Sequence, residues 1–131
     1  MVSPAARRLH DVLERFEAKD IEGVVQLFAS DGVFTDPHYP PPIGPTMVGH
    51  DAIRQGITWS VSILEQPNFS VRHTLFDPVS GGVAAVEVDT HHELVGGVVL
   101  TFTQVFVGEV NDDGRLRRMQ GYTPYPPPAS P

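Results

Sequence analysis

Cysteine is absent from the 131 residues, which excludes disulfides, thiolate nucleophiles, Cys-ligated zinc and iron–sulfur clusters. There is also no run of about 18 apolar residues that would cross a membrane, and no basic segment followed by an apolar stretch that would mark a signal peptide. We therefore expect a soluble, cytoplasmic protein with no membrane partner. Its stability must come from packing, and a hydrophobic content of 40% allows a substantial core in one domain.

Positive charge is scarce, because Lys and Arg number 9 against 16 Asp and Glu, and the formal net charge is -7. Phosphate binding is mainly an electrostatic contribution of Arg and Lys, so the composition argues against a nucleic-acid partner. The one basic cluster, Arg115, Arg117 and Arg118, follows an acidic turn and is interpreted as a solvated strand end. No Gly-rich phosphate loop, dinucleotide fingerprint or Ser-His-Asp order is present, so we expect neither a cofactor nor covalent hydrolysis.

A metal site is considered because His91 and His92 follow Asp89 closely. Neighbouring strand residues face opposite sides of a sheet, so only Asp89, His91 and Glu93 would share a face. These three positions span roughly 13 Å of strand, which is too far to close on one ion without ligands from other elements. The sequence therefore predicts no metal site.

Apolar residues recur at helical spacing in three segments. The first predicted helix covers residues 4–19 and is amphipathic. The second is capped by Asp20, buries a face that ends with Phe28, and is stopped by a turn at residues 31–32. The third runs from about residue 51 to residue 64. Three helices thus come before most of the strands.

The rest of the chain has the two-residue period of strands. A short strand at residues 33–36 is followed by a proline-rich loop at 37–49. Four longer strands, at 69–75, 86–94, 98–107 and 116–122, form a meander with hairpin-length connections. Helices followed by a meander predict an α+β fold, in which a cone-shaped, curved antiparallel (mixed) sheet wraps around the three N-terminal helices.

The domain is predicted to cover residues 4–123. The tail at 124–131 holds five prolines, so we expect it to be extended or disordered.

Asp36 is the first candidate for chemistry, because the stretch Leu27–Pro37 runs a short strand into this one carboxylate beside Phe34. A carboxylate at the mouth of an apolar cone loses solvation, which raises its pKa toward the range useful for proton transfer. The alternative is that Asp36 only caps the turn before Pro37. Both interpretations remain open.

Three further polar residues are predicted to point into the same cavity if the apolar strand faces look inward: His73, His92 and Gln104. A histidine within reach of Asp36 would complete a dyad, and Gln104 would donate a hydrogen bond to a developing oxyanion. In the alternative, each histidine is a half-buried ring whose hydrogen bonds are satisfied by the backbone. The expected cavity wall consists of Phe34, Trp59, Leu75, Val88, Leu100, Phe102, Phe106 and Met119.

Three aromatic residues near the expected entrance allow two interpretations each. His38 and Tyr39 follow Asp36 directly, and they either gate the cavity or lie in an exposed loop. Trp59 lies off the main apolar stripe of the third helix, where it either lines the cavity rim or packs under the proline-rich loop.

The element order, the motif LFASDGVFTDP at 27–37 and the motif GHDAIR at 49–54 resemble the nuclear-transport-factor-2-like superfamily. Within it, the chain is most similar to the ketosteroid-isomerase and SnoaL-like polyketide-cyclase branch. This resemblance implies a cystatin-like roll and matches Asp36 to the proton-shuttling base of the isomerases. Their oxyanion-binding tyrosine on the first helix corresponds to Val12 here, and their protonated aspartate corresponds to Gln104.

Two functions follow from the resemblance. The first is a small cofactor-independent enzyme that acts on a hydrophobic carbonyl-containing molecule by proton transfer, as an isomerase, cyclase or dehydratase with Asp36 as base. The second is a non-catalytic module for small-molecule binding or dimerisation. In either case we expect a homodimer through the outer sheet face, where Tyr122 lies and Glu87, Asp89 and Arg118 form the rim.

Overall fold

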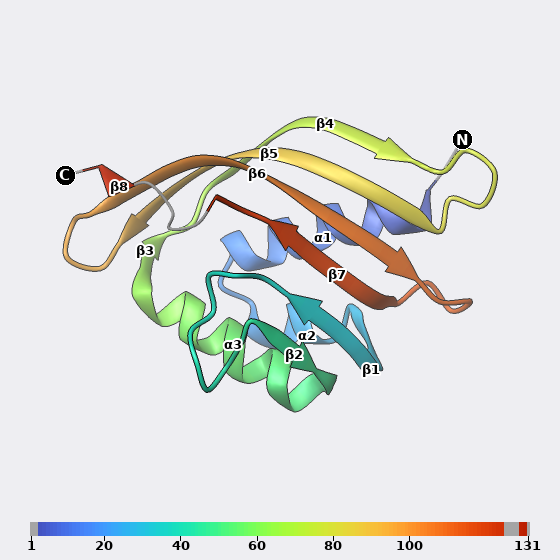
Figure 1. Cartoon of the computed structure of the whole chain (residues 1–131), viewed down its shortest axis with the longest axis horizontal. Coiled ribbons are helices and arrows are strands. Elements are labelled where there is room, and N and C mark those ends of the chain that lie inside the picture. Colours follow the sequence, from blue (N-terminus) through green and yellow to red (C-terminus); the bar gives the residue numbers. More distant parts are fainter. Residues whose placement is uncertain (1–2, 125–128, 131) are drawn as a thin grey trace.

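The computed structural model describes residues 3–124 and 129–130. Within this part of the chain, three helices lie beneath one curved sheet (Figure 1). The helices are α1 (Pro4–Glu17), α2 (Ile21–Val25) and α3 (Gly49–Ile63). The strands are β1 (Phe28–Thr35), β2 (Thr46–Val48), β3 (Leu64–Gln66), β4 (Phe69–Phe76), β5 (Val83–Leu94), β6 (Val99–Val110), β7 (Leu116–Tyr122) and β8 (Ala129–Ser130). This arrangement confirms the predicted α+β class.

The sheet is mixed, with the order β2-β1-β7-β6-β5-β3. Only the β1–β7 pair is parallel among the described strands, and the other pairs are antiparallel. β5 and β6 form the longest hairpin, with a continuous register from Val83 opposite Glu109 to Glu93 opposite Val99. β4 pairs with the other edge of β5, and the long strands curve over the helices (Figure 1). The concave face of the sheet therefore looks toward the helices (Figure 1).

α1 begins as the sequence predicts, because the Ser3 hydroxyl caps it by accepting the backbone N–H of Ala6 at 3.1 Å. Its buried stripe is Ala5, Leu9, Val12, Leu13 and Phe16. This stripe packs against β5 and β6. The approach is close at Gly108, where a Cβ atom would lie 2.7 Å from a methyl group of Leu9.

The predicted second helix is too long. α2 is only five residues long, and the Asp31-Gly32 pair lies inside β1 instead of ending the helix. Phe28, expected on the helix, pairs in parallel with Leu116, and the register then shifts before Val33. Tertiary pairing with β7 thus overrides the helical spacing of this segment.

Two short strands also lie where none is predicted. β2 forms at the end of the proline-rich loop and pairs with β1, and β3 follows α3 directly. Neither contains proline, so their N–H groups are available for pairing. The expectation for the tail falls mostly on residues 125–128 and 131, which lie outside the described part. Its residues 129–130 form β8, opposite Val99 and Leu100. No helix in residues 3–124 is both long and apolar enough to span a membrane.

Candidate functional site

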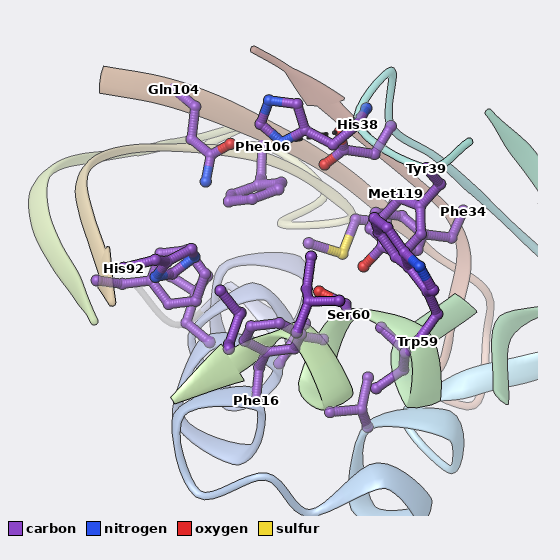
Figure 2. Close-up of a pocket in the computed structure, with 18 of the residues that line it drawn as sticks. Phe16, Phe34, His38, Tyr39, Trp59, Ser60, His92, Gln104, Phe106 and Met119 are labelled. Atoms are coloured by element: carbon purple, nitrogen blue, oxygen red, sulfur yellow. Dashed lines mark hydrogen bonds and ion pairs between the residues drawn. The ribbon is translucent and has the colours of Figure 1, made fainter. Parts of the chain in front are cut away.

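A cavity of about 200 Å³ lies between the concave face of the sheet and the helices. An engineered apolar cavity of about 150 Å³ is large enough to bind benzene, so this space is more than a packing defect. Its wall is mainly apolar and aromatic, with a few polar groups directed inward (Figure 2). The apolar wall includes Phe16, Phe28, Phe34, Trp59, Phe69, Leu100, Phe102, Phe106 and Met119. The polar groups belong to Asp36, His38, Tyr39, Ser60, His92 and Gln104.

Six of the eight predicted wall residues lie in this wall: Phe34, Trp59, Leu100, Phe102, Phe106 and Met119. Val88 is fully buried in the core, outside the cavity wall. The prediction that Leu75 faces inward is wrong, because its exposed fraction is 69%.

The same error affects His73. Val71 on β4 lies opposite the buried Val88, but a bulge follows Val71, so that His73 lies opposite Glu87. One extra residue in β4 therefore moves the following side chains to the other face of the sheet. The His73 side chain is 70% exposed, and its Nδ1 lies 2.8 Å from a carboxylate oxygen of Glu87. His73 is an outer-face residue and takes no part in the cavity.

Asp36 directly follows β1 and is only 5% exposed. Its Oδ1 accepts the backbone N–H of His38 at 3.0 Å, which closes the turn at Pro37. Burial raises the pKa of Asp36, while this hydrogen bond and the nearby His38 ring oppose the rise. Room for the carboxylate comes from Gly121 on β7, where a Cβ atom would lie 2.7 Å from Oδ2. The carboxylate thus caps a turn and faces the cavity at the same time.

The imidazole beside Asp36 is that of His38, for which the sequence predicts only a gate or a loop position. Its Nδ1 is 3.8 Å from Oδ1 of Asp36, and its ring forms a T-shaped pair with the Phe102 ring at a centroid distance of 5.2 Å. Nε2 of His38 is buried without a hydrogen-bond partner among the described residues. The sequence signal for this position is the Asp36-Pro37-His38 spacing. Because Asp36 caps the turn, the side chain two positions later points back toward its carboxylate.

His92 lies in the cavity wall on β5, away from the Asp36 turn. Its Nδ1 accepts the backbone N–H of Asn68 at 3.0 Å. Burial, as the largest cause, and the charges of the nearby His38 and His91 together lower the pKa of His92 to about 4. No hydrogen bond joins His92 to Asp36 in residues 3–124, so the structure does not bring these two together as a dyad.

Gln104 projects from β6 into the cavity and is 4% exposed. Its Nε2 donates to the Thr90 hydroxyl at 2.9 Å, and its Oε1 accepts the Thr123 hydroxyl at 2.8 Å. These two partners fix the orientation of the amide. The second N–H of Nε2 forms no hydrogen bond within the described residues, and it remains for a ligand.

A buried phenol completes the set of polar groups. Tyr39 packs between the rings of Phe34 and Trp59, at centroid distances of 5.6 and 5.5 Å. Burial raises the pKa of Tyr39 well above its usual range, a hydrogen bond from Ser60 opposes this, and the charge of Asp36 adds to it. The phenol therefore stays neutral and can donate. It enters from the loop after Asp36, while Val12 lies on α1 at the position of the isomerase tyrosine.

A metal site is not supported by the described residues, which contain no group of three His, Asp or Glu side chains placed to hold an ion. The polar groups of the cavity are hydrogen-bond donors and a single carboxylate. Such a set suits proton transfer or the binding of an oxygen-bearing ligand.

Comparisons with known proteins agree with this fold. The profile of the SnoaL-like domain family matches residues 7–119. No curated protein matches the sequence.

Among solved structures, RV0760c from Mycobacterium tuberculosis in complex with estradiol-17beta-hemisuccinate is 25% identical with a TM-score of 0.82, over 95% of this chain and 96% of that chain. A computationally designed 17-OHP binder is 26% identical with a TM-score of 0.78, over 94% of this chain and 93% of that chain. Delta 5-3-ketosteroid isomerase from Mycobacterium sp. is 22% identical with a TM-score of 0.78, over 94% of this chain and 95% of that chain. At that identity, the isomerase supports a similarity of fold alone.

Proposed function

Because the chain belongs to the SnoaL-like domain family, as its motifs predict, we propose that it is a cofactor-independent enzyme acting on a hydrophobic carbonyl-containing small molecule. The reaction is a proton transfer, in an isomerase, cyclase or dehydratase, and Asp36 is the base. The observation that carries this proposal is a carboxylate only 5% exposed in the wall of an apolar cavity. A stable fold seldom buries a carboxylate without a partner cation, so a functional reason is favoured.

The chemistry follows from the raised pKa of Asp36, since a stronger base removes a weakly acidic proton more readily. Asp36 takes a proton from the carbon next to the ligand carbonyl, the C–H electron pair forms a C=C bond, and the carbonyl π pair moves to oxygen. Gln104 has a spare N–H and Tyr39 a hydroxyl proton to stabilise that oxygen. Return of the proton to another carbon gives an isomer. Attack of the enolate carbon on a second carbonyl closes a ring, and the resulting alkoxide takes the proton back from Asp36. Alternatively, a β-hydroxyl leaves from the enolate with the proton returned by Asp36, which releases water and gives a dehydrated product.

The ligand class is supported by the wall and by the neighbours. The wall is mainly aromatic and aliphatic, which favours a ligand with several apolar rings. RV0760c is described in complex with estradiol-17beta-hemisuccinate, and the designed protein is a 17-OHP binder. Steroids and aromatic polyketide-like molecules are therefore the first ligands to test.

A binding module without catalysis is the second candidate. Two observations favour it. The first is that Oδ1 of Asp36 already accepts the backbone N–H of His38 in the turn. In addition, Val12 supplies no hydroxyl at the position where the isomerases have one. In this case the cavity binds the ligand but no proton moves.

The test compares Asp36→Asn with wild type in ligand-induced thermal stabilisation and in turnover of enones and β-hydroxyketones. Asp31→Asn is the matched control, because Asp31 lies on β1, the strand that leads into Asp36, but is exposed. We expect Asp36→Asn to keep ligand stabilisation and to lose about 10²–10⁴-fold in turnover. Equal turnover in the two variants contradicts Asp36 as base. Stabilisation of wild type without any turnover favours the binding module.

We also propose that the outer sheet face forms a homodimer interface. Leu75, Val83 and Tyr122 are exposed on the strands, at 69%, 40% and 51%. Exposed apolar side chains on a sheet face favour association. Light scattering of wild type and Tyr122→Glu checks this: a dimer mass for wild type and a monomer mass for the variant are expected, and a monomeric wild type contradicts it.

A further inference from the structure

The His92 ring is held in place from three sides. The ring packs beside Phe16 in a tilted arrangement and against Phe69 in a T-shaped one, with ring-centroid distances of 6.2 and 4.9 Å. Its Nδ1 accepts the N–H of Asn68, and the carbonyl of Asn68 accepts the backbone N–H of His91 at 3.0 Å. The start of β4 thus clamps the ring against β5, and the ring has little freedom to turn.

The Asn68 contact also decides which ring nitrogen carries the proton. A backbone amide can only donate, so Nδ1 must keep its lone pair and the proton of a neutral imidazole is on Nε2. Adding a proton to Nδ1 would break this hydrogen bond at a buried position, in agreement with a pKa lowered to about 4. Nε2 forms no hydrogen bond with any described residue, although the ring lines the cavity. The cavity therefore contains an oriented N–H donor that does not become an acceptor.

This donor lies far along the sheet from the proposed base. Asp36 is next to Gly121, which lies opposite Phe106 on β6, whereas His92 lies opposite Leu100 on the same strand. Six residues of β6 separate these two levels, and the His38 ring beside Asp36 packs on Phe102, which lies between them on β6. Figure 2 shows His92 on the opposite side of the cavity from Tyr39 and Trp59.

We infer that His92 is a specificity-determining residue that recognises an acceptor oxygen at the end of the ligand remote from Asp36. This inference rests on the proposed function, since it places the ligand in the same cavity. It narrows the ligand class to elongated molecules of several linked or fused rings, with a ketone, ether or ester oxygen at the far end. A group that can only donate, such as an ammonium, finds no acceptor on His92 because Nδ1 is already occupied.

The protonation state is tested first, without any ligand. NMR of the protein with isotopically labelled imidazole nitrogens reports which nitrogen carries hydrogen, and His92→Phe identifies the resonances. We expect a proton on Nε2 and a bare Nδ1 at pH 7. A proton on Nδ1, or on both nitrogens, overturns the inference whether or not the protein is an enzyme.

Recognition is tested with two probes, androstenedione, which has a ketone at each end, and its analogue that lacks the ketone of the five-membered ring. Trp59 is the single tryptophan and lines the cavity, so its fluorescence measures both dissociation constants. We expect wild type to prefer the diketone by about tenfold, and His92→Phe to bind both probes equally. His92→Gln, which offers an amide N–H, should recover part of the preference.

The outcomes separate the two proposals. The same preference in wild type and His92→Phe overturns recognition by His92 but leaves the cavity and Asp36 as proposed. Binding of neither probe overturns the ligand class named here. Loss of turnover in Asp36→Asn bears on the proposed function alone, because the side chain at position 36 lies outside the contacts of His92. If His92→Phe does not fold, His92→Gln and the NMR result still decide the inference.

Discussion

Gly121→Ala tests whether the room left for the Asp36 carboxylate matters. The added Cβ would lie 2.7 Å from Oδ2 and 3.1 Å from Cγ of Asp36. An ordinary contact begins at 3.4 Å, so the carboxylate must move by at least 3.4 − 2.7 = 0.7 Å. The backbone of Gly121 is not in the left-handed region, so alanine adds no strain of its own. The substitution therefore acts mainly on Asp36.

The magnitude follows from the size of that shift. Overpacking of a buried site costs about 1–3 kcal/mol, and each kcal/mol lowers Tm by about 4 °C in a domain of this size. A displacement of about 1 Å at a catalytic group can reduce the rate about 10²-fold. We expect both losses in Gly121→Ala, measured by thermal unfolding and by turnover of the substrate found in the ligand screen.

A double-mutant cycle separates this contact from a general packing defect. In the Asp36→Ala background the carboxylate is gone, so Gly121→Ala should cost much less stability than in wild type. Gly82→Ala is the control, because its Cβ would have no neighbour closer than 3.5 Å. Full activity of Gly121→Ala, together with equal stability losses in the two backgrounds, would refute the reasoning.

Three further predictions concern charge and packing. Burial raises the pKa of Asp36, so folding disfavours its ionised form, and wild type loses stability as pH rises through the pKa of the folded state. In urea unfolding, Asp36→Asn should therefore be more stable than wild type at pH 7. This difference in stability should vanish below about pH 4, where Asp36 is protonated in both the folded and the unfolded state. His73→Ala should change stability by less than about 1 kcal/mol and leave ligand binding unchanged in calorimetry, because its ion pair is exposed; a loss of binding would contradict its outer position. Phe28→Ala should cost about 3–5 kcal/mol in the same urea assay, since Phe28 is 1% exposed, and a cost under about 1 kcal/mol would contradict its place in the core.

The long hairpin was predictable because its alternation is regular. On β5 and β6 every second residue is buried over most of the length, and the register carries no bulge. His92 and Gln104 therefore lie in the cavity wall as the pattern predicts. β4 begins with the same alternation, but the bulge between Val71 and His73 reverses it. Such a bulge leaves no mark in hydrophobic spacing, because it depends on how the strand pairs with β5.

The proline-rich loop limited what could be predicted of the site. Proline removes the periodicity on which side-chain directions rest, so the positions of His38 and Tyr39 could not be derived. Their placement depends on a turn closed by Asp36 and on packing against residues far along the chain. The prediction of a turn at Asp31-Gly32 was wrong for a related reason. The pair has the composition of a turn, but long-range pairing with β7 places it in a strand.

The parallel pairing of β1 with β7 has a consequence for the order in which the site assembles. Asp36 directly follows β1, whereas Gly121, on the partner strand β7, lies 85 positions after Asp36 in the chain. Contacts between such distant segments form slowly, because the intervening loop must close first. During synthesis on the ribosome, the helices and the first strand emerge long before β7 does. The wall around Asp36 is therefore complete only when almost the whole chain has been synthesised. A chain truncated before Leu116 would lack β7, so it would expose the unpaired edge of β1 and would not form the cavity.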